Sequence, residues 1–174
     1  MKRLIFSFAF LFALTFCSSV FAGVDIHYAE WGKIVELKRI AVEFSTDSLK
    51  YKHKRPFAEF LYKAKRVKDW KAQSLGYFIG NFNERLAVFG IEAYDADGDE
   101  KSSYVLRLVP QNVTSGGKLE GYATVVESLT GNMVVGLYFS TSDGDDDDEI
   151  TFRDPLKELG DCVGKAFVNG LKKL

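Results

Sequence analysis

Hydrophobic residues recur at helical spacing in two segments of the chain. From Asp69 to about Phe89, apolar positions at offsets of 0, 3, 4, 7, 11 and 14 fall on one narrow stripe of a helix: Leu75, Phe78, Ile79, Phe82, Leu86 and Phe89. Asp69 is the expected N-cap of this helix and Gly90 its expected C-terminal cap. A closing helix opens at Asp154-Pro155, and its apolar face holds Leu156, Leu159, Val163, Phe167, Leu171 and Leu174. We expect Phe82 and Phe167 to be buried against the same sheet.

The apolar side of the closing helix also carries glycines, at positions 160, 164 and 170. Each costs about 1 kcal/mol relative to alanine in helix propensity, so close packing must offset the cost. The favoured interpretation is close contact between this helix and the sheet. The alternative is a groove for another chain.

The remaining apolar segments alternate or run continuously, as strands do. Ile40, Val42 and Phe44 share one face of the first such segment, and a Thr130-Gly131-Asn132 turn joins the last two into an antiparallel hairpin. Residues 57 to 65 are suited to a short helix. The predicted strands are Lys38 to Phe44, Ile91 to Tyr94, Tyr104 to Val109, Leu119 to Glu127 and Met133 to Phe139.

These elements predict the α+β class. The expected architecture is a mixed, mostly antiparallel sheet of about four to five strands with two main helices packed on it. We expect residues 23–174 to form a single domain, because no repeat or linker divides them.

Residues 1–22 have the pattern of a signal peptide. Lys2 and Arg3 precede an apolar run of 13 residues from Leu4 to Phe16, whereas a membrane-spanning helix needs about 20. Cleavage is expected after Ala22, which makes the protein exported, either periplasmic or secreted, with no transmembrane segment in its mature form. The alternative is a lipoprotein acylated at Cys17, which is disfavoured because the bulky Phe16 stands where a small residue is needed.

Composition and charge add little chemistry to this picture. The chain has 23 basic and 24 acidic residues and is 47% hydrophobic, which is typical of a folded domain and excludes disorder. Cys17 leaves with the signal peptide, so Cys162 stands alone and the mature chain has no intramolecular disulfide.

Charge is distributed most unevenly in a basic stretch. Between Lys50 and Lys71 there are nine Lys or Arg residues against Glu59 and Asp69, interleaved with aromatic residues. Such a surface suits an acidic envelope protein or an anionic membrane surface, whereas an exported location argues against nucleic acid. The alternative is compensation within the chain by the acidic segments at 92–100 and 143–149, or plain solvation. The candidate interaction patch is Lys52, Lys54, Arg55, Lys63, Lys65, Arg66 and Lys68.

Other candidate sites do not develop into motifs. Asp95, Asp97 and Asp99, and likewise Asp143, Asp145 and Asp147, lack the glycine and the glutamate that an EF-hand loop needs, so we expect solvated loops and no metal. The alternative is a weak, opportunistic cation site. His27 and His53 are interpreted as surface residues without a role, and Cys162 as a residue at a packing boundary, because no nucleophile–base motif surrounds them. We therefore expect no cofactor, no catalytic residues and no enzyme.

The order of several hallmark segments resembles a known group. Ile40-Ala-Val-Glu-Phe44, Asp69-Trp70, Phe82-Asn83 and Tyr104-Val-Leu-Arg-Leu108 are followed by the Val125-to-Val135 hairpin and a Leu159-Gly160-x3-Gly164-x2-Phe167-x3-Leu171 helix. In this order residues 38–174 resemble uncharacterised secreted bacterial envelope proteins and, more distantly, lipoproteins of the curli-secretion and penicillin-binding-protein-activator type. The resemblance implies a mixed sheet with helices packed on it and a role in binding envelope partners.

Two function classes remain open. The first is a non-enzymatic envelope protein that binds another macromolecule through a sheet edge or the basic stretch. The second is a small-ligand carrier or an enzyme. A concave pocket that gathers several titratable residues would favour the second class, and its absence would favour the first.

Overall fold

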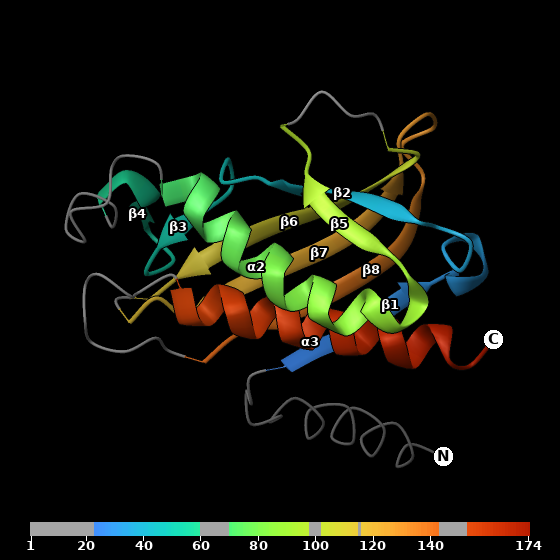
Figure 1. Ribbon diagram of the computed structural model, residues 1–174. Coiled ribbons are helices and arrows are strands. Elements are labelled where there is room, and N and C mark those ends of the chain that lie inside the picture. Colours follow the sequence, from blue (N-terminus) through green and yellow to red (C-terminus); the bar gives the residue numbers. More distant parts are fainter. Residues whose placement is uncertain (1–22, 60–69, 98–101, 115, 143–152) are drawn as a thin grey trace, which may run out of the picture.

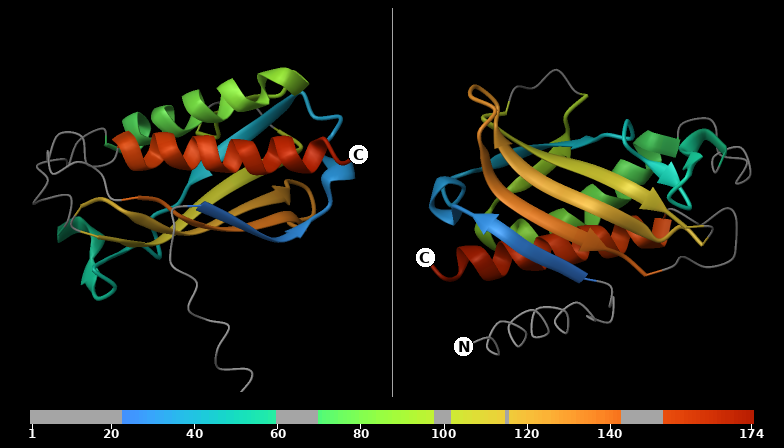
Figure 2. Two further views of the ribbon diagram at one scale, coloured as in Figure 1. Left: turned by 90° about the horizontal axis from the view of Figure 1, so that it is seen from below. Right: turned by 180° about the vertical axis from the view of Figure 1, so that it is seen from behind.

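One large sheet with two long helices on a single face makes up the molecule (Figures 1 and 2). The computed structural model describes residues 23–59, 70–97, 102–114, 116–142 and 153–174. The helices are α2 (Trp70–Leu86) and α3 (Arg153–Leu171), and α2 continues into the 3-10 turn η2 (Ala87–Phe89). The strands are β1 (Gly23–Ala29), β2 (Arg39–Phe44), β3 (Lys50–Tyr51), β4 (Arg55–Pro56), β5 (Glu92–Asp95), β6 (Tyr104–Val113), β7 (Leu119–Glu127) and β8 (Met133–Ser140).

The sheet contains both antiparallel and parallel strand pairs. The main path runs β1-β8-β7-β6-β2-β5, and β3 joins the far end of β6 beside β2. β1, β8, β7 and β6 pair antiparallel, whereas β2 pairs parallel with both β5 and β6. The return from β2 to β5 passes through α2, because parallel neighbours need a crossover connection.

Alternation along the central strands creates the two faces of the sheet. Leu106 and Leu108 of β6 are fully buried, and their partners on β7 are Val125 and Ala123. Arg107 lies between the two leucines and is exposed on the other face. The buried face packs against the helices, and the opposite face, called here the outer face, has no described helix over it (Figure 2).

The helical stripe predicted from periodicity forms the centre of the core. Leu75, Phe78, Phe82 and Leu86 of α2 are at most 2% exposed, and Phe167 of α3 is as deeply buried. The Phe82 ring stacks on Phe78 with centroids 5.3 Å apart and meets Phe167 edge-on at 5.1 Å. Phe82 and Phe167 therefore lie on the same side of the sheet, as expected.

The three glycines of α3 correct one expectation. A Cβ on Gly160 would meet the backbone of Phe78 and lie 3.1 Å from Asn81 Cβ, and one on Gly164 would lie 2.6 Å from Arg85 Cβ. Gly170 contacts the ring of Trp31. The close packing is confirmed, but it joins α3 to α2 and to Trp31 and not to the sheet, because α2 lies alongside α3 on the same face of the sheet.

The strand count also differs from expectation, since the sheet formed by the described residues has eight strands where four to five were predicted. β1 was missed because it is an edge strand with exposed residues on both faces and a register shift between Ile26 and Tyr28. β3 and β4 were missed because two-residue strands carry no periodic signal. The α+β class itself is confirmed.

The predicted boundaries of the helices are mostly accurate. Gly90 has a left-handed φ of 64° directly after η2, as a C-terminal cap does. α3 begins at Arg153, one residue before the predicted cap. Residues 57–59 are helical; the rest of the short helix predicted to residue 65, and the cap at Asp69, lie outside the described residues.

Candidate functional site

A polar recess of about 510 Å³ lies where the β3–β4 hairpin meets the sheet. The hairpin projects on the side of the sheet opposite α2 and α3 (Figure 2). The recess lies on the outer face, because Glu120 and Tyr138 alternate along their strands with the buried core residues Leu119 and Leu137. Side chains from the hairpin and from three strands line it: Lys50, His53, Gln111, Asn112, Glu120 and Tyr138.

The turn of the hairpin has an unusual backbone. Lys52 and His53 have φ values of 50° and 60°, and neither is the glycine or asparagine that this left-handed region favours. Such strain persists only where the surroundings hold it. Here Tyr51 is buried, and the Lys52 N–H donates to the carbonyl of Val113 on β6 at 2.9 Å. The hairpin is therefore held firmly against β6.

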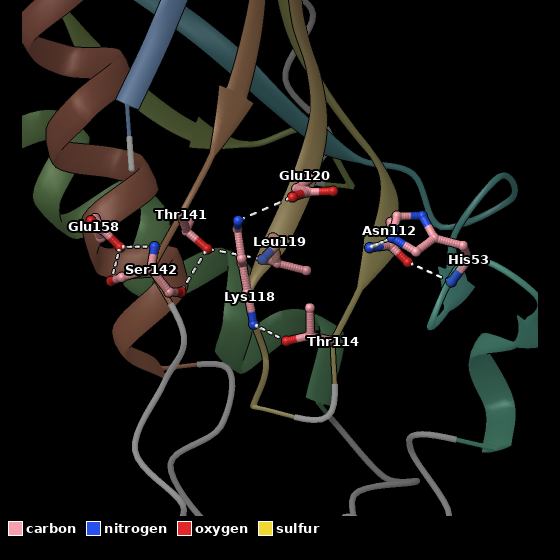
Figure 3. Close-up of polar contacts among 9 residues, drawn as sticks. All are labelled: His53, Asn112, Thr114, Lys118, Leu119, Glu120, Thr141, Ser142 and Glu158. Atoms are coloured by element: carbon pink, nitrogen blue, oxygen red, sulfur yellow. Dashed lines mark hydrogen bonds and ion pairs between the residues drawn. The ribbon is translucent and has the colours of Figure 1, made fainter. Parts of the chain in front are cut away.

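Asn112 of β6 fastens His53 through both ends of its amide (Figure 3). The His53 backbone N–H donates to Asn112 Oδ1 at 2.7 Å, and Asn112 Nδ2 lies 3.1 Å from His53 Nε2. Because the first bond fixes Oδ1, the amide NH₂ must donate to Nε2, which places the ring proton on Nδ1. Asn112 is 4% exposed, so a buried group sets the orientation of the imidazole.

A bulge in β6 shapes the floor of the recess. The pairing of β6 with β7 shifts between Pro110 and Asn112, which leaves Gln111 without a partner on β7. Opposite the bulge lies Gly121, where a Cβ would be 2.5 Å from Pro110 Cα and 3.0 Å from the Gln111 nitrogen. Only glycine permits this close approach of the two backbones.

Charged and aromatic groups complete the lining. Lys118 Nζ pairs with Glu120 Oε1 at 3.1 Å, both side chains being largely buried. Burial, and then the charge of Glu120, raise the pKa of Tyr138, so its hydroxyl stays protonated and able to donate at neutral pH. The Tyr138 ring meets Tyr122 of β7 edge-on at 5.5 Å, which extends the lining onto the outer face.

The neighbouring end of the sheet is tied to α3 by a separate group of bonds (Figure 3). Thr141 Oγ1 accepts from the Leu119 N–H at 2.9 Å. Glu158 Oε2 accepts from the backbone N–H and the hydroxyl of Ser142 at 2.8 and 2.6 Å. Because these bonds join the end of β8 to β7 and to α3, we assign this group a structural role.

The candidate interaction patch is described only in part. Lys52, Lys54 and Arg55 are exposed on the hairpin, and Arg55 Nη1 pairs with Glu59 Oε1 at 2.7 Å. Within the described ranges, no carboxylate pairs with Lys52 or Lys54. The other four residues, Lys63, Lys65, Arg66 and Lys68, lie outside the described residues.

Sequence reasoning did not predict the surroundings of His53. Its surface position is as expected, but its imidazole is clamped by Asn112 and lines the recess. Asn112 gave no signal for this contact, because the predicted strand ended at Val109 and the structure extends β6 to Val113. Asn112 and His53 are also 59 residues apart in the sequence.

The acidic loop and Cys162 have local contacts where the structure describes them. The Asp97 N–H donates to Asp95 Oδ1 at 2.9 Å, which closes a local turn; Asp99 and residues 143–149 lie outside the described residues. Burial, followed by Glu158 and Asp161, raises the pKa of the Cys162 thiol, so it is a poor nucleophile. No group of metal-ligating side chains occurs among the residues that the structure covers.

Comparison with known proteins identifies no family. No protein-family model and no curated protein matches the sequence. None of the helices in the described part of the chain has the length and apolar character needed to span a bilayer. In fold, the chain is similar to PelC of Paraburkholderia phytofirmans in two dodecamer structures, both at 9% identity: a variant with TM-score 0.42 over 82% of this chain and 98% of that one, and another crystal form with TM-score 0.40 over 80% and 98%.

Proposed function

We propose that this chain is a non-enzymatic, exported envelope protein that binds an acidic macromolecule through the β3–β4 hairpin. The observation that carries the proposal is the rigid presentation of the hairpin cations. Lys52 and Lys54 are exposed on a strained turn that β6 holds in place, and no described carboxylate neutralises them. The Lys52 ammonium lies 5.4 Å from the centroid of the Tyr51 ring, and neither lysine has a carboxylate partner among the described residues. A fixed array of such cations attracts an acidic partner and orients it.

The clamp on His53 supports binding over catalysis. A general base needs its free ring nitrogen beside the proton that it removes. The acceptor nitrogen of His53 instead receives the Asn112 amide. The resemblance to envelope-binding proteins, which stays a prediction, points in the same direction.

A small-ligand carrier or an enzyme is the second candidate, and the recess favours it. The recess gathers Lys50, His53, Glu120 and Tyr138, which are all titratable. Its volume also lies within the usual range for small-molecule sites. The two candidates predict different binding behaviour. The first predicts that affinity depends on the exposed charges of the hairpin, and the second that it depends on whether the ligand is small enough to enter the recess.

Reversing the hairpin charges tests the first candidate. In the variant Lys52→Glu, Lys54→Glu, Arg55→Glu, we expect capture of the envelope partner from extracts to be lost, because attraction becomes repulsion. Capture by the unmodified protein should weaken steeply with salt, since exposed charges are screened beyond about 8 Å at physiological ionic strength. Thermal melts should change little, because surface charges usually contribute about 0–1 kcal/mol each.

A matched triple reversal provides the control. Lys38, Lys172 and Lys173 are exposed and lie outside the hairpin, so their replacement by glutamate changes the net charge equally. We expect this control to retain capture. A hairpin variant that melts at a much lower temperature and still captures the partner would instead mean that the hairpin charges are paired within the chain.

The exported location gives a separate prediction. The mature protein is expected to begin at Gly23 and to carry no lipid, because the apolar run is short and Phe16 precedes Cys17. Intact-mass measurement of the exported form checks this. A species that begins at Cys17 with added acyl mass would contradict it.

A further inference from the structure

We propose that the polar recess is a carboxylate-binding site that receives an acidic side chain of a partner's peptide segment. This inference rests on the proposed function and names the chemistry of its binding site. Lys50 supplies the charge, and the His53 Nδ1–H and the Tyr138 hydroxyl supply hydrogen bonds.

The donors of the recess are oriented in advance. Asn112 is buried and occupies Nε2 of His53, so the remaining ring N–H is the donor that the imidazole can offer to a ligand. The raised pKa of Tyr138 keeps its hydroxyl protonated. A site with fixed donors binds an anionic oxygen at a lower entropic cost than a mobile one.

The side-chain charges of the recess favour an anionic ligand over a cationic one. Glu120 is already neutralised by Lys118 at 3.1 Å. Lys50 is exposed and has no carboxylate partner within the described residues. Among the lining residues, the charge left without an opposite partner is therefore that of Lys50, while the carboxylate of Asp25 lies near Tyr138 on the β1 side and is not part of the lining. Ammonium-to-carboxylate hydrogen bonds are among the strong ones.

The surroundings of the recess favour a peptide over a small acid. Lys52 and Lys54 are exposed on the same hairpin, where the flanking carboxylates of a longer chain can reach them. On the other side, Tyr122 is 42% exposed beside Tyr138 and offers an aromatic surface to a peptide backbone or side chain. A single small carboxylate would use only the recess.

The experiment measures binding of a fluorescein-labelled deca-glutamate peptide to the mature protein by fluorescence anisotropy at low salt. Lys50→Met keeps the aliphatic stem and removes the charge, and it should weaken binding about tenfold or more. His53→Asn removes the imidazole while retaining a residue that accepts a left-handed φ, and it should weaken binding several-fold. Lys172→Met is the matched control and should leave binding unchanged, because Lys172 directly follows the end of α3, near the C-terminus that Figure 1 marks on the side away from the hairpin.

Further binding measurements distinguish a peptide carboxylate from a small acid. They also separate the proposal for the recess from the proposed function of the hairpin. If succinate binds and competes with the peptide, the result supports a carboxylate site. If succinate binds as tightly as the peptide does, the result overturns the assignment of a peptide as the ligand. Peptide binding that survives Lys50→Met but is lost on hairpin charge reversal would overturn the recess and leave the proposed function standing. Binding to anionic phosphatidylglycerol vesicles without binding to the peptide would overturn both. Thermal melts of each variant confirm that it is folded.

Discussion

Replacement of Phe82 by alanine is expected to lower the free energy of unfolding by about 3–5 kcal/mol. The ring is fully buried, stacks on Phe78 and meets Phe167 edge-on, so its removal leaves a cavity at the contact between the two helices and the sheet. Packing around three rings cannot collapse into that space without moving α2. Urea denaturation measures the change, and the slope of the transition should stay constant.

Val88 provides the matched control for this prediction. It follows α2 in the turn η2 and is 72% exposed, so Val88→Ala should change stability by no more than about 0.5 kcal/mol. Phe167→Ala should resemble Phe82→Ala, and the two changes should not be additive, because the rings are in contact. A loss below about 1 kcal/mol for Phe82→Ala would mean that the stripe faces solvent.

Replacement of Gly121 by alanine is expected to destabilise the fold by about 1–3 kcal/mol or more. The added methyl group would overlap backbone atoms of the β6 bulge, including Pro110 Cα at 2.5 Å, and paired strands cannot separate locally without losing ladder hydrogen bonds. Thermal melts and urea denaturation report the loss.

The same substitution elsewhere should have the opposite sign. Gly80 lies on an exposed position of α2, and a Cβ there meets no atom within 4 Å. Gly80→Ala should therefore stabilise the protein by about 0.4–1 kcal/mol through helix propensity and a less flexible unfolded chain. Equal effects at the two positions would contradict the close approach of β6 and β7.

The elements with strong periodicity could be predicted well. The stripe on α2, the span of β7 and the β7–β8 hairpin all agree with the structure, because each depends on neighbours within a few residues. Gly90 was identified as a cap for the same reason. β1 and the β3–β4 hairpin were not found, since an exposed edge strand and two-residue strands have no apolar period.

The recess was beyond the reach of such reasoning. Its lining comes from segments far apart in the chain, and the residues that shape its floor, Gly121 and the bulged Gln111, belong to no sequence motif. The glycines of α3 illustrate the same limit, because their spacing predicted close contact but not that α2 and Trp31 would provide it. The spacing of the glycines shows that small residues share one face of the helix, but it does not show which element packs against that face.

By itself, the sequence determined the class of the fold, the two helical stripes and the apolar strands that bury them, because burial of apolar surface acts on patterns repeated every few residues. Only the tertiary structure decided that β3 pairs in parallel with β6 and so brings His53 to Asn112. That contact depends on which strands become neighbours across the sheet. Strand order follows from how the helices and the loops close the whole chain, and no local pattern records it.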